Sequence, residues 1–291
     1  MNTDLRKIFK KINDYGVLVM FSHTIFSLSF ALISMLLAGE GKLKPMVIFW
    51  ILVAFMGART GANALNRVID AEIDAKNPRT ATRQLPQGLM NKKEVLVFVI
   101  VCFGIMVFAT WKLNTICLIL SPIALFLMII YSYTKRFTWM CHLVLGVTSA
   151  AAPVGAWLAV TGKISLIPLV MGAANTLWVA GFDIIYGAQD YDFDTKNGIH
   201  SIPAKFGIKN ALNISSAFHV LAVMFLFIVG VLSPELGIIY YIGLIINTVL
   251  FIIQHKMVTE DNLKNVKIAS YSINQVISIV FLLTGLIDCL I

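Results

Sequence analysis

Long runs without a charged side chain constrain this chain more than any other feature. Nine such runs, one of them interrupted once by Arg59, cover most of the 291 residues. A helix needs about 20 apolar residues to cross the hydrocarbon core of a bilayer, and irregular backbone is too costly to expose there. We therefore predict an all-α, polytopic membrane protein with nine transmembrane helices, at residues 15–39, 45–66, 95–111, 113–134, 137–162, 164–182, 210–234, 236–255 and 268–287.

Composition excludes the alternative of two soluble domains, which the length alone would allow. Hydrophobic residues make up 58% of the chain and charged residues 13%, whereas soluble proteins carry about 25% charged residues. The net charge of +8 does not indicate a nucleic-acid partner, because the basic residues are spread over short loops. We expect one transmembrane domain over residues 1–291, with the lipid bilayer as its surroundings and no nucleic-acid partner.

The Lys and Arg residues predict how the chain is oriented. Loops on the cytoplasmic side of a membrane carry an excess of these residues. With the N-terminus inside, 18 of the 23 Lys and Arg residues fall in inside loops and four in outside loops. We predict a cytoplasmic N-terminus and a multi-pass protein of a bacterial-type inner membrane.

Acidic residues gather in two short clusters, which hold seven of the 15 in the chain. Acids near hydrocarbon are costly and are usually functional. The first cluster reads DAEIDAKN from Asp70 and the second reads DYDFDTKN from Asp190, so both fit DxxxDxKN. The match indicates an internal repeat with two facing halves. The acidic motifs then occupy residues 66–74 and 183–194, at the inner ends of the second and sixth spans.

Helical geometry places the first motif on one stripe. Residues advance by about 100° along a helix, and five polar residues then fall within about 80° of arc: Arg59, Asn63, Asn66, Asp70 and Asp74. Such a stripe must face the interior of the bundle, where we expect a central cavity. Glu72 points the other way, and the dipeptide Asn77-Pro78 is expected to end the helix.

The second motif follows the same geometry. Asp183, Asp190 and Asp194 share a helical face, and Asp192 lies opposite if the helix persists. Two carboxylates four residues apart suit Mg²⁺, an ion that is often shared with a substrate phosphate. Two facing pairs predict a clamp that holds one diphosphate through two or more Mg²⁺ ions. Basic residues stand nearby for the remaining phosphate charge: Lys76, Arg79, Arg83, Lys135 and Arg136.

These stretches resemble a known family. NRVIDAEIDAKNPRTATRQLPQG, residues 66–88, resembles the NxxxDxxxD signature of UbiA-type membrane prenyltransferases. DIIYGAQDYDFDTKNGIHSIPAKFG, residues 183–207, resembles their second acidic motif, and YSYTKR, residues 131–136, resembles the segment after their fourth helix. The resemblance covers essentially the whole chain. It implies a bundle of nine helices with both acidic motifs on the cytoplasmic side.

The resemblance also implies roles for the matching residues. Metal ligation is implied for Asn66, Asp70, Asp74, Asp190 and Asp194, and catalysis for the same aspartates together with Asp183. Diphosphate binding is implied for Arg79, Tyr131 and Lys135, and acceptor binding for Arg59. We add Arg83 and Asn63 as substrate-binding residues from their positions, although no motif fixes the role of Asn63. No role is assigned to Asp192 or to His23, a polar residue in the first span.

The implied activity is Mg²⁺-dependent transfer of a polyprenyl group from polyprenyl diphosphate to an aromatic acid. We expect 4-hydroxybenzoate as the acceptor, in quinone biosynthesis. The block NPRTATRQLPQG also resembles a bacterial subgroup linked to the futalosine route to menaquinone, where the acceptor would be 1,4-dihydroxy-6-naphthoate. Arg59 would serve either carboxylate. An ion or phosphate transporter is the remote alternative, and it predicts acids near the middle of the bilayer instead of at its inner face.

Overall fold

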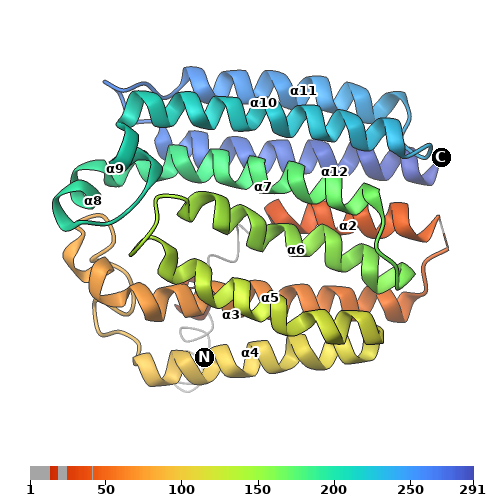
Figure 1. The fold of residues 1–291 in the computed structure, drawn as a ribbon, viewed down its shortest axis with the longest axis horizontal. Coiled ribbons are helices and arrows are strands. Elements are labelled where there is room, and N and C mark those ends of the chain that lie inside the picture. Colours follow the sequence, from red (N-terminus) through yellow and green to blue (C-terminus); the bar gives the residue numbers. More distant parts are fainter. Residues whose placement is uncertain (1–13, 19–24, 41) are drawn as a thin grey trace, which may run out of the picture.

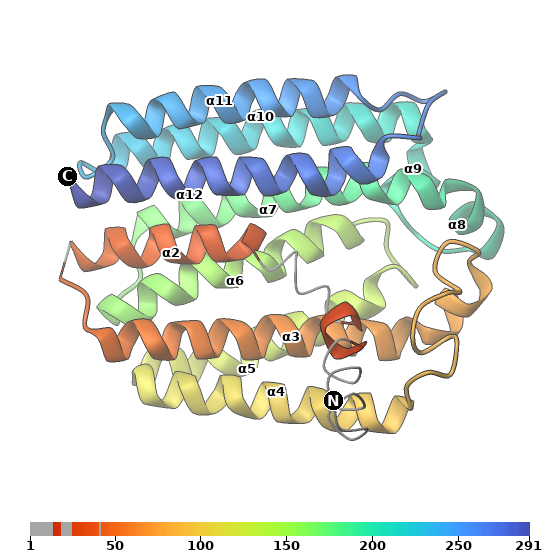
Figure 2. The same ribbon diagram turned by 180° about the vertical axis from the view of Figure 1, so that it is seen from behind.

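The computed structural model describes residues 14–18, 25–40 and 42–291. This part of the chain is a bundle of long, nearly parallel and antiparallel helices (Figures 1 and 2), without any β-sheet. The helices are α2 (Ile25–Gly39), α3 (Pro45–Lys76), α4 (Lys92–Leu113), α5 (Thr115–Thr134), α6 (Cys141–Thr161), α7 (Leu166–Gly187), α8 (Tyr191–Asn197), α9 (Ile202–Phe206), α10 (Ile208–Leu232), α11 (Ile238–Lys256) and α12 (Asn274–Leu290), with a 3₁₀ turn at Ala188–Asp190 and a π-helix at Ile268–Ile273.

Eight helical segments in the described residues are long and apolar enough to cross a membrane. They correspond in order to the second to ninth predicted spans, so the all-α, multi-pass architecture is confirmed. The first predicted span is represented by the shorter α2. Residues 19–24, and with them His23, lie outside the described part. The ninth crossing and the cytoplasmic N-terminus therefore stay predictions.

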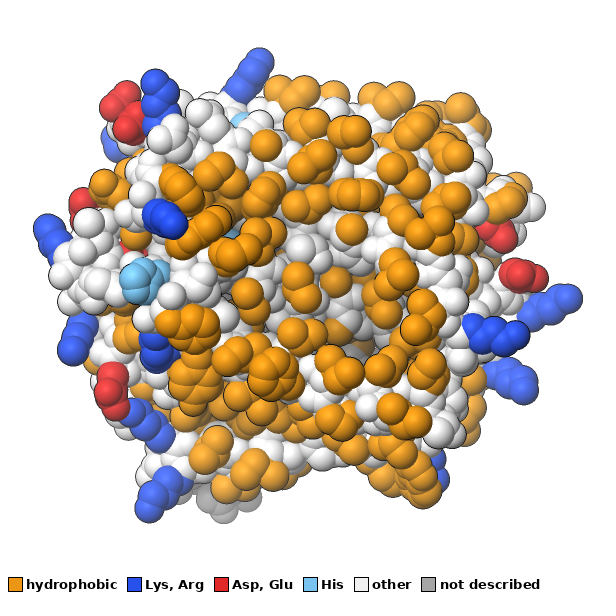
Figure 3. All heavy atoms as spheres, in the orientation of Figure 1, with side chains coloured by type: hydrophobic (Ala, Val, Ile, Leu, Met, Phe, Trp, Pro, Cys, Tyr) orange, Lys and Arg blue, Asp and Glu red, His pale blue; other side chains and the backbone are white. Residues whose placement is uncertain are grey.

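The outer surface explains why this chain belongs in a bilayer. Figure 3 shows apolar side chains spread over the sides of the helices, with most Lys, Arg, Asp and Glu side chains at the two ends. Exposed apolar surface of this extent is not tolerated by a soluble monomer. The sides of the bundle therefore face lipid, and its two ends face water.

The polar connections gather at one end of the bundle, which we call the motif end. It comprises residues 77–91, 135–140, 188–207 and 257–267, and it lies at the left of Figure 1 with α8 and α9. Helix α3 starts at the opposite end and has 32 residues. At 1.5 Å per residue it is about 48 Å long, whereas the hydrocarbon core is about 30 Å thick. The excess length carries the first acidic motif out of the hydrocarbon.

Helices α6 and α7 approach each other closely at a glycine. A Cβ atom added to Gly146 of α6 would lie 2.2 Å from the carbonyl oxygen of Thr176 on α7. Small residues at such interfaces let membrane helices pack backbone against backbone. The close approach brings the first turn of α6 beside the end of α7, where the second acidic motif begins.

Replacing Gly146 by alanine should destabilise the protein. The added methyl group must push α6 away from the α7 backbone, and overpacking of this kind costs about 1–3 kcal/mol. Thermal unfolding in detergent should show a lower Tm than that of the wild type. Gly155→Ala on the same helix is the matched control, because an added Cβ there meets nothing within 4 Å. Equal Tm values for the two variants would contradict the packing argument.

Candidate active site

The first acidic motif lies on the part of α3 nearest the motif end. Asp70 and Asp74 are buried, with 3% and 4% of their surfaces exposed. Asn66 Nδ2 donates a hydrogen bond to Asp70 Oδ2 at 2.9 Å. Glu72, by contrast, has 87% of its side chain exposed, 3.4 Å from Lys92 Nζ. The stripe predicted from helical geometry does face inward, and Glu72 faces outward.

The turn after α3 folds back over this motif. The helix ends at Lys76 with Asn77 as its C-cap, as expected from the proline that follows. The Asn77 side-chain oxygen accepts a hydrogen bond from the backbone N–H of Arg79 at 3.0 Å. Six residues after Asn77, Arg83 Nη1 donates to both carboxylate oxygens of Asp74, each at 2.7 Å. The turn thus places a cation against the second aspartate of the motif.

The second acidic motif crosses a break between helices. Helix α7 ends at Gly187, the 3₁₀ turn follows, and α8 starts at Tyr191. The sequence allows one helix to continue through residues 183–194, but the structure interrupts that helix at the 3₁₀ turn. Asp183, Asp190 and Asp194 nevertheless border one cavity, and Asp192 is exposed. Asp194 accepts a hydrogen bond from Ser201 Oγ at 2.9 Å.

Hydrogen bonds join the two motifs directly. Asn77 Nδ2 and Arg79 Nε both donate to Asp190 Oδ1, each at 2.8 Å. The Arg79 guanidinium also donates to the Tyr186 hydroxyl, and its carbon lies 4.7 Å from the centre of the Tyr186 ring. Burial works against the charge on Arg79, but the bonds to Asp190 and Tyr186 outweigh it and raise the pKa of the guanidinium above its ordinary value. The two motifs therefore face each other as predicted.

Two cations from the segment after α5 hold Asp70. Lys135 Nζ lies 2.7 Å from Oδ2, and Arg136 Nη1 lies 3.1 Å from Oδ1. Arg136 also donates to the backbone carbonyls of Ser132 and Ile69, both at 2.8 Å. Because Asp70 is buried, losing both cations would leave its charge uncompensated away from water, which is strongly destabilising.

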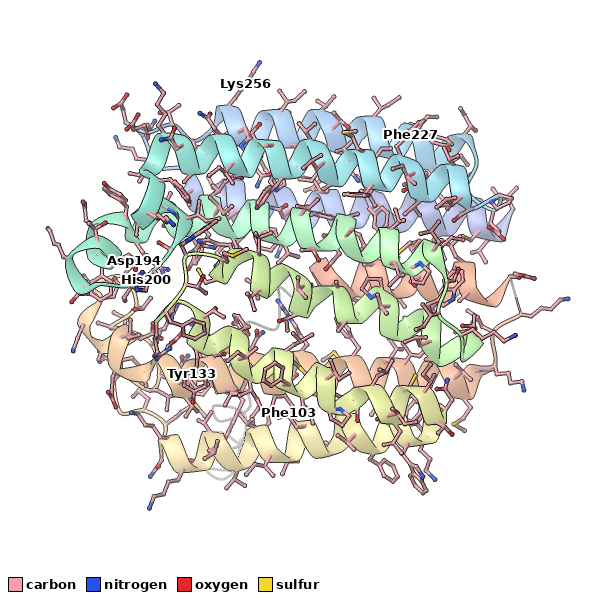
Figure 4. The ribbon with its side chains drawn as sticks, viewed as in Figure 1. Phe103, Tyr133, Asp194, His200, Phe227 and Lys256 are labelled. Atoms are coloured by element: carbon pink, nitrogen blue, oxygen red, sulfur yellow. The ribbon has the colours of Figure 1, made fainter. Side chains whose placement is uncertain are left out.

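These groups line a polar cavity of about 270 Å³ at the motif end. All the site residues predicted from the sequence border it: Arg59, Asn63, Asn66, Asp70, Asp74, Arg79, Arg83, Tyr131, Lys135, Asp183, Asp190 and Asp194. Figure 4 shows Asp194 at this end of the bundle, with His200 beside it, whereas Phe227 lies towards the opposite end.

A second cavity of about 400 Å³ adjoins the first and is lined mainly by apolar side chains of α2 to α6. Arg59, Asn63 and Tyr131 border both cavities. The apolar cavity extends to Leu113 and Leu158, near the end of the bundle opposite the motifs. The two cavities together form one amphipathic space, charged at the motif end and apolar within the bundle.

The polar cavity offers oxygen ligands but no closed metal cage. Within the described ranges, no three His, Cys, Asp or Glu side chains lie close enough to hold a metal ion by themselves. Mg²⁺ suits such an open arrangement, because it binds through one or two carboxylates and completes its shell with water and phosphate oxygens. The carboxylates of both motifs, and the side-chain carbonyl of Asn66, therefore fit an ion that bridges the protein and a phosphate.

Comparison with known proteins identifies the family. The model of the UbiA prenyltransferase family matches residues 27–278. The chain belongs to the UbiA prenyltransferase family. It is a prenyl-transferring enzyme with membrane-spanning helices.

Relatives of this UbiA protein agree with that assignment. A Shewanella oneidensis protein named 4-hydroxybenzoate octaprenyltransferase is 34% identical over 220 residues, which are 74% of each chain. A UbiA homologue from Aeropyrum pernix has a TM-score of 0.83 and 34% identity, and the match covers 93% of this chain and 98% of that chain. A UbiA homologue from Archaeoglobus fulgidus, solved with GPP and Mg²⁺, shares the fold with a TM-score of 0.73 at 18% identity, over 96% and 100% of the two chains.

Several residues at the cavity of this UbiA protein were missed as site residues. Arg67 carried a signal, because it lies about 20° from Asp74 on the stripe of α3 and it borders the polar cavity. Asn77 was interpreted as the end of a helix, and its bond to Asp190 had no signal in the sequence. Nothing in the sequence singled out Tyr186, which contacts Arg79. His142, a polar residue in the predicted span at residues 137–162, forms a hydrogen bond with Asp183 of α7.

Replacing Asn77 by alanine should weaken prenyl diphosphate binding. The change removes one of the donors to Asp190 and the acceptor that orients the Arg79 backbone, so the two motifs are held less firmly at one spacing. We expect an affinity loss of about tenfold for geranyl diphosphate in the presence of Mg²⁺, measured by calorimetry. Gln87→Ala is the control, because Gln87 is in the same loop, is exposed, and its side chain donates to the Ala81 carbonyl and not to the motifs. Equal affinities for both variants would show that the link is not needed.

Proposed function

We propose that this UbiA family member transfers a polyprenyl group from a polyprenyl diphosphate to 4-hydroxybenzoate in a Mg²⁺-dependent reaction. The observation that carries the proposal is the amphipathic space, in which a charged cavity adjoins an apolar one. A prenyl diphosphate has the same division, with a charged head and an apolar tail. The name of the Shewanella oneidensis relative, 4-hydroxybenzoate octaprenyltransferase, supports the choice of acceptor.

The polar cavity is assigned to the diphosphate. Asp70, Asp74, Asp190 and Asp194, with Asn66, would hold two or more Mg²⁺ ions. When bound, these ions supply Lewis-acid neutralisation of the departing diphosphate. Cationic side chains add to it, since fixed charges aimed at a leaving group stabilise the transition state. The cations placed for this are Arg79, Arg83 and Lys135, with the Tyr131 hydroxyl at the same wall.

The acceptor is assigned to the junction of the two cavities. Arg59 lies seven residues before Asn66, which is about 10 Å along the helix. A guanidinium at that depth forms two parallel hydrogen bonds with a carboxylate more favourably than an ammonium does. Asn63, one turn nearer the motif, is placed to bond the acceptor from the same wall.

The reaction then follows from these placements. The C–O bond between the prenyl C1 and the diphosphate breaks, and its electron pair leaves with the diphosphate. The acceptor carbon next to the hydroxyl forms a C–C bond with C1, and the proton displaced from that carbon passes to a carboxylate, for which Asp183 is placed. The apolar walls of the second cavity exclude water, which would otherwise capture the allylic cation.

The proposal also covers the location of the protein. Residues 1–291 form one domain in a bacterial inner membrane, with the motif end in the cytoplasm. The product enters ubiquinone biosynthesis. The excess of Lys and Arg in the loops of the motif end supports this orientation. The block NPRTATRQLPQG keeps 1,4-dihydroxy-6-naphthoate as the alternative acceptor. Assays with each acid as sole acceptor distinguish the two. The transporter alternative is not retained, because the chain belongs to a family of prenyl-transferring enzymes.

Removing the divalent metal should abolish turnover. Membranes treated with EDTA should lose transfer of the geranyl group to 4-hydroxybenzoate and regain it with added Mg²⁺. Asp70→Ala and Asp190→Ala should each lower turnover by at least about 10²-fold, a typical size for losing a main charge-stabilising group. Glu72→Ala and Asp192→Ala are matched controls, because these acids belong to the same motifs but are exposed. Normal turnover in the chelator would contradict the proposal.

Arg59 should control the acceptor and not the donor. Arg59→Ala should raise the apparent KM for 4-hydroxybenzoate by at least about tenfold, since a charge-assisted pair is lost. The KM for geranyl diphosphate should stay near its wild-type value. Arg59→Lys should restore the acceptor KM in part, because an ammonium lacks the planar fork. A larger effect on the donor KM would place Arg59 in the diphosphate site instead.

A further inference from the structure

Asp183 is hydrogen-bonded to His142, a histidine that has no role in the proposed reaction as described above. His142 is the second residue of α6, and its Nδ1 lies 2.7 Å from Asp183 Oδ2. The side chain of His142 is 6% exposed and that of Asp183 is 28% exposed. Both residues border the polar cavity. The pair therefore lies at the wall of the reaction space, with the histidine more buried than the carboxylate.

The surrounding helices leave room for the imidazole ring in this position. Gly187 lies at the end of α7, and a Cβ atom added there would come within 3.1 Å of His142 Cε1. The close approach of α6 and α7 at Gly146 keeps the two side chains within hydrogen-bond reach. The ring nitrogen that faces an ionised carboxylate carries the proton, so Nδ1–H donates to Asp183 Oδ2.

Asp183 differs from three other aspartates of the cavity in the kind of partner it has. Asp70 is paired with Lys135, Asp74 with Arg83, and Asp190 with Arg79. A carboxylate held by a permanent cation is a poor proton acceptor. The imidazole of His142 donates one hydrogen bond and so orients the Asp183 carboxylate. Asp183 and Asp194 are thus the two cavity carboxylates that these contacts orient without pairing them with Lys or Arg. Because Asp194 is assigned to the metal in the proposed function, Asp183 is the one left to accept the proton.

We propose that His142 is a positioning residue for the proton-accepting carboxylate. Its Nδ1–H holds Asp183 Oδ2, which leaves the other carboxylate oxygen to face the acceptor ring. When the new C–C bond forms and the diphosphate leaves, the proton displaced from the ring carbon goes to that oxygen, and His142 keeps its own proton. This inference rests on the proposed function and specifies how its last step is arranged.

Three substitutions test the inference. His142→Leu removes the donor. His142→Asn keeps an amide N–H near the position of Nδ1, whereas His142→Gln carries its N–H towards the position of Nε2. His200→Leu is the matched control, because His200 is exposed at the motif end and its side chain does not border the cavity. Each purified variant is assayed for transfer of the geranyl group to 4-hydroxybenzoate, and its affinity for geranyl diphosphate with Mg²⁺ is measured by calorimetry.

General acid or base groups contribute about 10²–10⁴-fold to rates, so loss of orientation should lower kcat of His142→Leu by at least about tenfold. Its affinity for geranyl diphosphate should stay within about twofold of the wild-type value. The proposed role of His142 lies in proton transfer and involves no contact with the prenyl donor. His142→Asn should recover most of kcat, and His142→Gln should recover less. If His142→Leu does not accumulate, the test rests on comparing the kcat values of the other two variants, with His142→Asn expected to exceed His142→Gln.

Equal kcat values for His142→Leu and wild type would overturn the inference, and so would a Gln variant better than the Asn variant. A parallel loss of donor affinity would show a structural role instead. Failure of the proposed function has a different signature, since the wild-type protein itself would then transfer no prenyl group to the aromatic acid. The two failures are therefore separated by the wild-type assay.

Discussion

Asp70 and Asp74 are buried at the end of an apolar bundle, where an unpaired carboxylate would be very costly. Each has a cation within 2.7 Å, from Lys135 after α5 and from Arg83 in the loop after α3. Because the cations belong to connections and the acids to a helix, the same bonds that neutralise the acids also fix where the connections lie. The arrangement of the connections at the motif end depends on this pairing.

The division of the internal space into a polar and an apolar cavity follows from the length of α3. Helix α3 is longer than the hydrocarbon is thick, so one polar stripe along it passes from the apolar interior to the aqueous edge. Arg59 lies on the part that borders both cavities, and Asp74 lies on the part that borders the polar one. A single helix thereby sets the order in which an amphipathic molecule would meet carboxylate, amide and guanidinium groups.

The parts of this architecture that could be predicted from the sequence are those encoded locally. The acids of the first motif repeat with the period of a helix, and the proline after Asn77 marks the end of that helix. The sequence of this one segment was therefore enough to predict both features. Helix ends were less predictable. Helix α7 continues to Gly187, beyond the predicted limit of residue 182, because a helix persists past the first charged residue that ends an apolar run.

The bonds between the motifs could not be predicted, since they depend on tertiary placement. Asn77 and Asp190 are 113 residues apart, and His142 and Asp183 are 41 residues apart. In both pairs the sequence around one partner did not indicate a role in the site. Asn77 precedes a proline, and His142 is one polar residue in an apolar span. Their importance comes from the packing of α6 on α7 and of the loop after α3 on the 3₁₀ turn, which no local pattern encodes.

The pairing of acids and cations also has a consequence for binding in the proposed function. A magnesium diphosphate brings charges of both signs into the cavity at once. In that function Asp190 would turn to a metal ion and Arg79 to a phosphate oxygen, so that neither group would be left unpaired. A molecule with one sign of charge would strand half of the groups it displaced, at the large cost of an uncompensated buried charge. The ion pair between Arg79 and Asp190 would therefore favour a ligand that carries metal and phosphate together over either one alone.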